Sequence, residues 1–231
     1  MLLKKMKYPG LELKLFEKAI IWRSYVYIIL KKFIKKNILE IGAGLGSFTV
    51  LYLNSNLRVT VTDLDKENYE FLKKRFKGKK IIITNKKIKN VKKKYDTIMY
   101  MNVLEHIKND KNEVYNSLKM VKTGGRLIFL VPAHQKLFSK FDKEIGHFRR
   151  YSKNFFTSLK LNDSKIEKLF HLDSSGYLLY FLNKLFFKNE TYPTEFKIFI
   201  WDKIFTPISF VLDWLLDYKI GKNIICIIKK N

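Results

Sequence analysis

The sequence predicts an α/β fold, in which a parallel sheet carries helices on both faces. Short runs rich in Ile, Val and Leu alternate with segments of helical periodicity through the first two thirds of the chain. A turn with three glycines joins the first apolar run to the helical segment after it. The 231 residues are 47% hydrophobic, enough to bury a sizeable core. Strands that alternate with helices pair in parallel, because each helix returns the chain to the same edge of the sheet.

Apolar runs bounded by turn residues give the order of the elements. The first five strands are expected at 37–41, 58–62, 80–84, 97–101 and 126–131. Helices are expected between them at 46–54, 66–77 and 110–122. For the last of these helices, Asp110 is the expected N-cap and Gly124-Gly125 the terminator.

The two ends of the chain differ in character from this alternating part. Residues 1–35 have helical periodicity and are expected to cap a ligand site. After the fifth strand comes a long polar and aromatic loop, 133–151, of the kind that is usually functional. A helix near 153–160, a strand near 165–172, an aromatic-rich helical section at 176–218 and a last strand at 223–229 complete the expected order.

The glycine turn is the most informative part of the sequence. A buried strand ends in Glu40, and Gly42, Gly44 and Gly46 follow at alternate positions. A turn without side chains lets a ligand lie against the backbone and against the N–H groups of a helix start. Asp63 closes the next strand, close to where nucleoside-binding folds place a carboxylate for ribose hydroxyls. These residues predict a nucleoside-cofactor site.

This G-x-G-x-G turn, with Glu40 before it and Asp63 after it, resembles the class I S-adenosylmethionine-dependent methyltransferases. The resemblance continues through two later blocks, Tyr95–Ile107 and Val121–Pro132, which look like the fourth and fifth strands of that fold. It implies a Rossmann-like, seven-stranded, mostly parallel sheet whose last strand is antiparallel and lies beside the sixth. It also implies S-adenosyl-L-methionine as the cofactor.

No linker separates a second domain, so we expect one domain over residues 1–231 with three parts. These are an N-terminal helical cap at 1–35, a cofactor-binding core at 36–172 and a helical insertion at 173–222 before the last strand. The family commonly has an acid after the third strand that contacts the adenine amino group, and this chain has Asn85 there instead. The cofactor-binding residues are expected to be Glu40, Gly42, Ala43, Gly44, Gly46, Asp63, Leu64, Asn85 and Asn102.

Three of the four histidines follow predicted strands at the edge where ligands of parallel sheets bind. Transfer to a hydroxyl benefits from a base with a pKa near neutral, so His106, His134 and His147 are the candidates for catalysis. The alternative for each is a hydrogen-bonded structural role, and for His106 also a capping role at a helix start. His171 lies inside a predicted strand and is expected to be structural.

Two adjacent arginines in the loop after the fifth strand are the main signal for substrate binding. Arg149, Arg150 and Tyr151 end this loop, and paired guanidinium groups match phosphate or carboxylate geometry. The alternative is a structural ion pair with Asp142 or Glu144 that orders the loop. The block is similar to a branch of the superfamily often found near glycan and lipid biosynthesis.

The formal charge of +25 suggests an anionic partner, but composition accounts for much of it. Only six of the 46 basic residues are arginine, which favours a solvated lysine surface. The densest cluster, Lys73–Lys94, holds twelve basic residues and no acid, and could form a basic flank. We therefore expect a small-molecule, glycan or lipid-linked partner in preference to nucleic acid.

Other composition features bound the setting of the protein. The single Cys226 is expected to be a buried, reduced thiol, and we predict no metal site. No secretory signal or uncharged run of the ~20 residues needed to span a membrane is present. The expected location is therefore cytoplasmic. An aromatic face at 201–215 either completes the core or reaches lipid as an interfacial helix, at the inner face of the membrane.

Together these features predict a methyltransferase that acts at oxygen on a small-molecule, glycan-linked or lipid-linked acceptor. An RNA methyltransferase that uses the basic surface is one alternative. Ribosomal adenine dimethylases need an Asn-x-Pro-aromatic motif after the fourth strand, which Met101–Glu105 lacks. A non-catalytic nucleoside-binding module is the other alternative.

Overall fold

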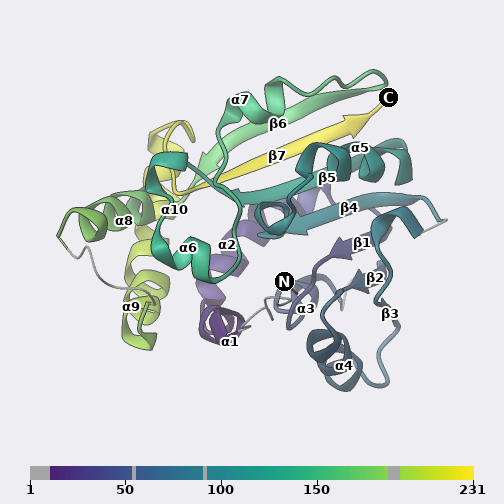
Figure 1. Ribbon diagram of the computed structural model, residues 1–231, viewed down its shortest axis with the longest axis horizontal. Helices are drawn as coiled ribbons and strands as arrows, with labels where there is room; N and C mark the ends of the chain where they lie inside the picture. The colour runs from purple at the N-terminus through teal and green to yellow at the C-terminus, as the bar shows by residue number, and fades with distance from the viewer. Residues whose placement is uncertain (1–10, 54–55, 91–92, 187–192) are drawn as a thin grey trace, which may run out of the picture.

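A seven-stranded sheet with the order β3-β2-β1-β4-β5-β7-β6 forms the centre of the molecule (Figure 1). This computed structural model describes residues 11–53, 56–90, 93–186 and 193–231. Pairing is parallel throughout β3-β2-β1-β4-β5, and β7 is antiparallel to both of its neighbours. The predicted sheet is confirmed. Its strands are β1 (Asn37–Ile41), β2 (Arg58–Thr62), β3 (Ile81–Thr84), β4 (Tyr95–Met101), β5 (Val121–Pro132), β6 (Ser164–Leu172) and β7 (Asn223–Lys230).

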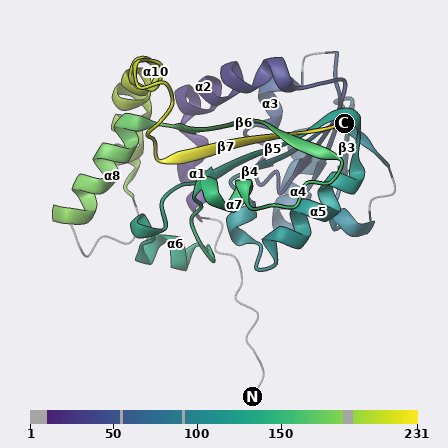
Figure 2. The same ribbon diagram turned by 90° about the horizontal axis from the view of Figure 1, so that it is seen from above.

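Helices cover both faces of the sheet, as Figure 2 shows from above. Helices α2 and α10 lie over one face, and α5 and α7 lie over the other. The α-helices are α1 (Leu11–Glu17), α2 (Ile20–Leu30), α3 (Thr49–Tyr52), α4 (Lys66–Arg75), α5 (Asp110–Met120), α6 (Lys140–Glu144), α7 (Lys153–Thr157), α8 (Ser174–Phe186), α9 (Glu195–Ile200) and α10 (Thr206–Leu215). A π-helical turn, Trp201–Phe205, joins α9 to α10. No helix among the described residues is long and apolar enough to span a membrane.

The alternation of side chains along each strand divides the core in two. Ile38 packs into one hydrophobic cluster with α2 and α4, whereas the next residue, Leu39, packs into the other with α5 and α7. Both side chains are fully buried, as expected for a strand with helices on either side. Cys226 is also fully buried, in β7, so its prediction as a buried thiol is confirmed.

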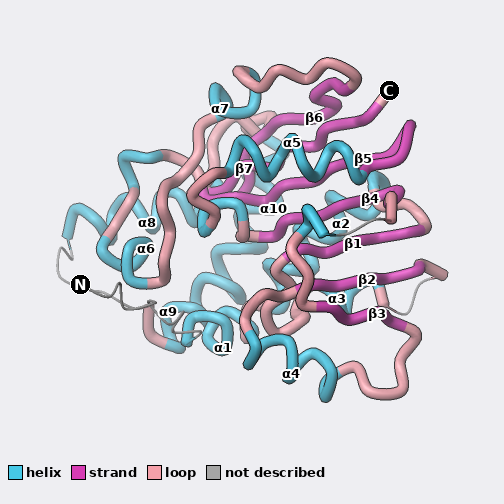
Figure 3. The backbone as a smooth tube through the Cα atoms, turned by 45° about the vertical axis from the view of Figure 1, so that its right-hand side comes forward, coloured by secondary structure: helices cyan, strands magenta, loops and turns pink. Residues whose placement is uncertain are grey.

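The strand order reverses at β1, whose neighbours are β2 on one side and β4 on the other. Helices that leave β1 and β4 diverge from such a point, and the crevice between them is where ligands of open α/β sheets bind. Figure 3 shows α1, α6, α8 and α9 grouped at one end of the sheet. Residues of α1 and α6 line a cavity there, together with residues that follow β1, β2 and β4.

Several predicted helices have different bounds in the structure, and two of them are informative. The helix expected at 46–54 is only α3, because the chain turns through the preceding residues and Phe48 is its N-cap. The helix expected at 110–122 ends at Met120, since Val121 already pairs with Tyr95 in the sheet. Its N-cap is Asn109, so the prediction of Asp110 was wrong. Gly124-Gly125 was also the wrong terminator and lies within β5, where the pairing register shifts.

Candidate functional site

The three glycines after β1 all adopt backbone conformations that favour glycine. Their φ angles are +65° for Gly42, +56° for Gly44 and +75° for Gly46. A Cβ on Gly46 would lie 2.6 Å from the ring of Phe76, and one on Gly42 would lie 2.8 Å from Val103. The turn therefore depends on glycine both for its conformation and for its close packing.

The backbone amides of this turn meet the end of β2. The N–H groups of Gly42 and Ala43 donate to the carbonyl of Thr62, at 2.7 and 3.1 Å. The N–H of Gly44 donates to Asp63 Oδ2 at 2.8 Å. Asp63 is 7% exposed, and burial raises the pKa of its carboxyl although hydrogen bonds from Asp65 and Gly44 oppose this. The turn and the predicted ribose-binding acid thus form one unit.

Glu40 lies beneath the turn in a nearly closed environment. Its Oε2 accepts a hydrogen bond from Thr49 Oγ1 at 2.5 Å and a short one from the Tyr52 hydroxyl. Burial raises the pKa of Glu40 to about 7, against these two hydrogen bonds. Because Thr49 and Tyr52 come from α3, Glu40 also fixes that short helix to the strand.

A cavity of about 850 Å³ opens at the carboxyl ends of β1, β2 and β4. Helix α1 lies over the glycine turn, where Leu13 comes within 3.3 Å of the position a Cβ on Gly44 would take. Glu12, on the same helix, lines the cavity and is 4% exposed. Neither of its carboxylate oxygens has a hydrogen-bond partner among the described residues. Sequence reasoning missed Glu12, because a single acid in a helix of mixed polarity carries no signal.

Most of the predicted cofactor residues line this cavity: Glu40, Gly42, Ala43, Gly44, Asp63, Leu64 and Asn102. Asn102 has a φ of +55°, a conformation that asparagine tolerates better than most residues. Gly46 does not line the cavity and instead packs against α4. Asn85 is exposed, and Lys86, Lys87 and Ile88 line the cavity after β3. The role of Asn85 at the adenine remains a prediction.

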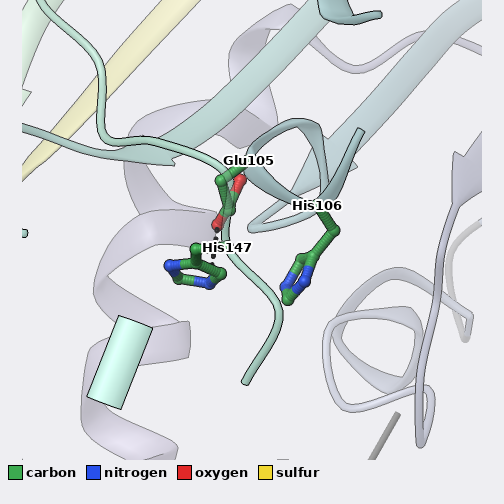
Figure 4. A group of neighbouring side chains, drawn as sticks. All are labelled: Glu105, His106 and His147. Carbon is green, nitrogen blue, oxygen red and sulfur yellow. Dashed lines mark ion pairs between the residues drawn. The ribbon is translucent and has the colours of Figure 1, made fainter. Parts of the chain in front are cut away.

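Two of the three candidate histidines meet beside Glu105 (Figure 4). The rings of His106 and His147 are edge to face, with their centroids 4.5 Å apart. His147 Nε2 lies 3.9 Å from Glu105 Oε1. Burial and the neighbouring His147 lower the pKa of His106 to about 3, so His106 is neutral at pH 7. Burial raises the pKa of Glu105 to about 7, although His147 acts in the opposite direction.

Hydrogen bonds to Asp142 fix the orientation of His147. The Nδ1 of His147 lies 2.9 Å from Asp142 Oδ1, and Arg150 contacts the same carboxylate at 2.9 Å. Burial opposes ionisation of Asp142, but His147, Arg150 and Ser139 together hold the pKa of its carboxyl well below the usual range. The loop itself docks on the turn that follows β4 through the N–H of Phe148, which donates to the Glu105 carbonyl at 2.8 Å. His147 is therefore held in place on two sides.

His134, the third candidate, lies outside the cavity lining. Its ring stacks on His171 at 5.2 Å, and its Nε2 is 3.0 Å from the carbonyl of Gly221. His171 is 9% exposed in β6, as expected for a structural residue. The structure thus separates His134 from the other two candidates, and a catalytic role for any of the three stays a prediction.

The two loop arginines have different surroundings. Arg149 pairs with Asp110 at 2.5 Å and donates to the Lys108 carbonyl, and it does not line the cavity. Arg150 lines the cavity, and its Nη1 is buried without a hydrogen-bond partner among the described residues. Tyr151 is buried and donates its hydroxyl to the Leu104 carbonyl and to Asp110, each at 3.0 Å. Of the three predicted substrate contacts, only Arg150 faces the cavity.

Comparison with known proteins agrees with this geometry. Residues 39–127 match the family model described as "Methyltransferase domain". No curated protein matches the chain. Among solved structures, the fold is similar to coclaurine N-methyltransferase bound to N-methylheliamine and SAH, with a TM-score of 0.60 and 15% identity over 92% of this chain and 72% of that one.

Two further solved structures have the same fold. The N-methyltransferase NodS from Bradyrhizobium japonicum WM9, in complex with S-adenosyl-L-homocysteine, gives a TM-score of 0.55 and 15% identity over 98% of this chain and 89% of that one. The plantazolicin methyltransferase BpumL, in complex with SAH, gives 0.54 and 16% over 94% and 84%. Residues 39–127 thus match a methyltransferase domain, and the chain as a whole has the fold of the class I S-adenosylmethionine-dependent methyltransferases.

Proposed function

We propose that this protein transfers a methyl group from S-adenosylmethionine to an oxygen of a small-molecule, glycan-linked or lipid-linked acceptor bound in the 850 Å³ cavity. The observation that carries the proposal is that the glycine turn and Asp63 line the same cavity as the buried carboxylates of Glu12 and Glu105, which would attract a cation. Glu12 is buried there with both oxygens unpartnered, and an unpaired buried carboxylate is costly unless a cation reaches it. S-adenosylmethionine supplies an activated methyl group together with a sulfonium and an ammonium charge.

The chain's own contribution is binding and alignment. Gly42 and Gly44 give the cofactor access to the backbone, and Asp63 offers its carboxylate to the ribose hydroxyls. An acceptor at the opposite side of the cavity would meet Arg150, His106 and His147. Alignment of an in-line displacement is worth about 7–11 kcal/mol, so holding the two partners is the main task of the site.

The surface of α10 supports an acceptor at a membrane, because the polarity of this helix is inverted. Its polar residues Thr206, Ser209 and Asp213 are fully buried, and apolar residues face outward. The exposed fractions are 50% for Phe210 and 69% for Trp214. Further exposed apolar side chains on α8–α10 are Leu178, Phe181, Phe196, Phe199, Ile204, Ile208, Val211 and Leu215.

An apolar helix face on a chain of charge +25 fits an anionic lipid surface, which attracts both the aromatic groups and the lysines. We therefore propose that α10 rests on the inner face of a membrane and brings the cavity to a lipid-linked acceptor. The expected result is sedimentation with vesicles of phosphatidylglycerol and phosphatidylcholine that Trp214→Glu abolishes. Ile82→Glu, at an equally apolar exposed site on the edge strand β3, is the matched control. Formation of a dimer in place of vesicle binding would contradict the proposal.

Calorimetry tests the cofactor. S-adenosylmethionine is expected to bind the purified protein, and Gly44→Asp to abolish binding because it places a charged side chain in the turn. Gly78→Asp is the control, since Gly78 has a similar φ of +77° with nothing near its Cβ position. Labelled methyl transfer into lysate, sorted as lipid, polymer or small metabolite and by methylated atom, then identifies the acceptor. Retention of binding by Gly44→Asp would refute the cofactor site.

Two alternatives have their own tests. Lys73 at the end of α4 and Lys77, Lys79 and Lys80 in the turn before β3 are exposed, so an RNA methyltransferase would show RNA binding that weakens steeply with salt. A non-catalytic nucleoside-binding module would bind S-adenosylmethionine and transfer no label to any fraction of the lysate.

A further inference from the structure

We propose that Glu105, His106 and His147 bind a divalent transition-metal ion of the Zn²⁺ type, which holds the acceptor oxygen next to the cofactor. The binding part of this inference stands on the geometry alone, whereas the role toward the acceptor rests on the proposed function. Each of the three side chains offers one ligand atom, and these atoms all lie within 4.8 Å of one another. Figure 4 shows the three side chains converging from the end of β4 and from the loop before α7.

The carboxylate of Glu105 lacks the partners that a buried charge needs. Glu105 is fully buried, and neither oxygen accepts a hydrogen bond from any described residue. No lysine or arginine among the described residues forms an ion pair with it, since Arg150 is matched to Asp142. The Nε2 of His147 lies 3.9 Å from Glu105 Oε1, too far for a hydrogen bond. A cation between the two groups would satisfy both.

Asp142 prepares His147 for this role. With Nδ1 2.9 Å from the Asp142 carboxylate, His147 donates its proton there, and Nε2 presents a lone pair toward Glu105. This carboxylate–histidine arrangement behind a ligand nitrogen is what metal-binding histidines generally have. Ser139 donates to the other oxygen of Asp142 at 2.8 Å, so the supporting carboxylate is itself fixed.

The donor set indicates the class of ion. Two imidazoles and one carboxylate suit Zn²⁺, Mn²⁺ or Fe²⁺ with open positions, whereas Mg²⁺ and Ca²⁺ prefer oxygen donors only. Bonds of 2.0–2.2 Å place two donors of a tetrahedral ion about 3.4 Å apart. The side chains therefore need to close by up to about 1.4 Å on binding, within the range of small rotamer changes.

The position of the three ligand residues in the cavity indicates a role for the ion. All three ligand residues line the cavity that the glycine turn and Asp63 also line. An ion with an open position there would bind an acceptor hydroxyl and lower its pKa, so that the O–H proton passes to water before the oxygen takes the methyl carbon. The sulfur keeps the electron pair of the broken carbon–sulfur bond.

The test is titration of chelator-treated full-length protein with ZnCl₂ by calorimetry, and with CoCl₂ by visible absorption. We expect one ion per chain, with cobalt bands of a histidine-ligated, low-coordinate site. Glu105→Gln and His147→Gln should each weaken binding at least ~10-fold. His171→Phe, which removes a histidine outside the cavity, should leave it unchanged.

Absence of saturable binding, or binding that Glu105→Gln and His147→Gln leave unaltered, would overturn the metal site. Circular dichroism of both variants shows whether they are folded. If they are not, the number of metal ions bound per wild-type chain still tests whether the metal site exists. S-adenosylmethionine binding measured in EDTA keeps the two proposals apart. If the protein binds S-adenosylmethionine but binds no added metal ion, only the metal site is refuted. If it binds the metal ion but not S-adenosylmethionine, only the proposed function is refuted.

Discussion

Buried carboxylates around one cavity are the main feature of this protein at the scale of single residues. Glu12, Glu40, Asp63 and Glu105 are each less than a tenth exposed, and none of the four forms an ion pair with lysine or arginine among the described residues. Burial raises the pKa values of Glu40, Asp63 and Glu105 for this reason. A site of this kind favours a positively charged ligand, and a sulfonium cofactor is such a ligand.

Glu40 makes stability depend on pH in a way that can be measured. Its folded-state pKa of about 7 lies above the ordinary 4.5, so the folded state holds the proton more tightly than the unfolded chain. Its contribution to stability is full below about pH 4.5 and is lost as pH rises through about 7. The total change is about 3 kcal/mol. Urea unfolding from pH 4.5 to 8 should show this loss.

Glu40→Gln is the matched variant, because glutamine keeps the shape and can still accept from Thr49 and Tyr52. The difference in unfolding free energy between glutamine and wild type should shift in favour of glutamine as pH rises from 4.5 to 8. A difference that stays constant over this range would show that Glu40 titrates normally in the folded protein.

Gly46→Ala should destabilise the protein by two separable effects. A positive φ costs an alanine about 1 kcal/mol, and the new methyl group would meet Phe76 and Leu72 at 3.0 Å or less. Gly78→Ala isolates the first effect, since its φ is +77° and its Cβ position is open. Chemical denaturation should therefore give a larger loss for Gly46→Ala than for Gly78→Ala, by roughly 1–3 kcal/mol. Equal losses would contradict close packing of the turn on α4.

At the scale of elements, α10 is held by its polar side. Asp213 is fully buried and accepts from the Tyr25 hydroxyl and from the N–H groups of Asp173 and Ser174, all at 2.8 Å. Asp213→Ala leaves these donors unpaired and should cost at least about 2 kcal/mol. Trp214→Ala, at the next position, should change stability by less than about 0.5 kcal/mol, because the ring is 69% exposed. Thermal unfolding of both variants tests the inverted polarity of α10. A large loss of stability for Trp214→Ala would contradict it.

The sequence allowed the strands to be predicted better than the contacts between elements. Runs such as Asn37–Ile41 are apolar and bounded by turns, so their positions follow from local pattern. The end of α5 could not be predicted in the same way. Val121 leaves the helix because it pairs with Tyr95, a partner 26 residues earlier that local pattern does not reveal. The sheet, not the Gly124-Gly125 pair, ends that helix.

The site could be predicted from the sequence only where its residues lie close together along the chain. The glycine turn and Asp63 lie at a fixed spacing along two adjacent strands, and the structure joins them directly. The pairing of Glu105 with His147 depends instead on how the loop after β5 docks on the turn that follows β4. For the same reason His134 and His147, both in that loop, end up in separate surroundings, and Arg149 pairs with Asp110, a partner outside the loop.

At the scale of the whole molecule, a cofactor that binds only the folded state should stabilise the protein by mass action. At 100 times its dissociation constant, S-adenosylmethionine would add about 2.7 kcal/mol, which for a chain of this size raises Tm by roughly 5–11 °C. Because α1 lies over Gly44 and supplies Glu12, hydrogen-exchange protection on binding should be largest in α1 and in the glycine turn. Glu12→Gln should retain the fold yet reduce both the Tm shift and the protection of α1. Protection spread evenly over the sheet, with α1 unchanged, would show that this helix is no cover for the cofactor.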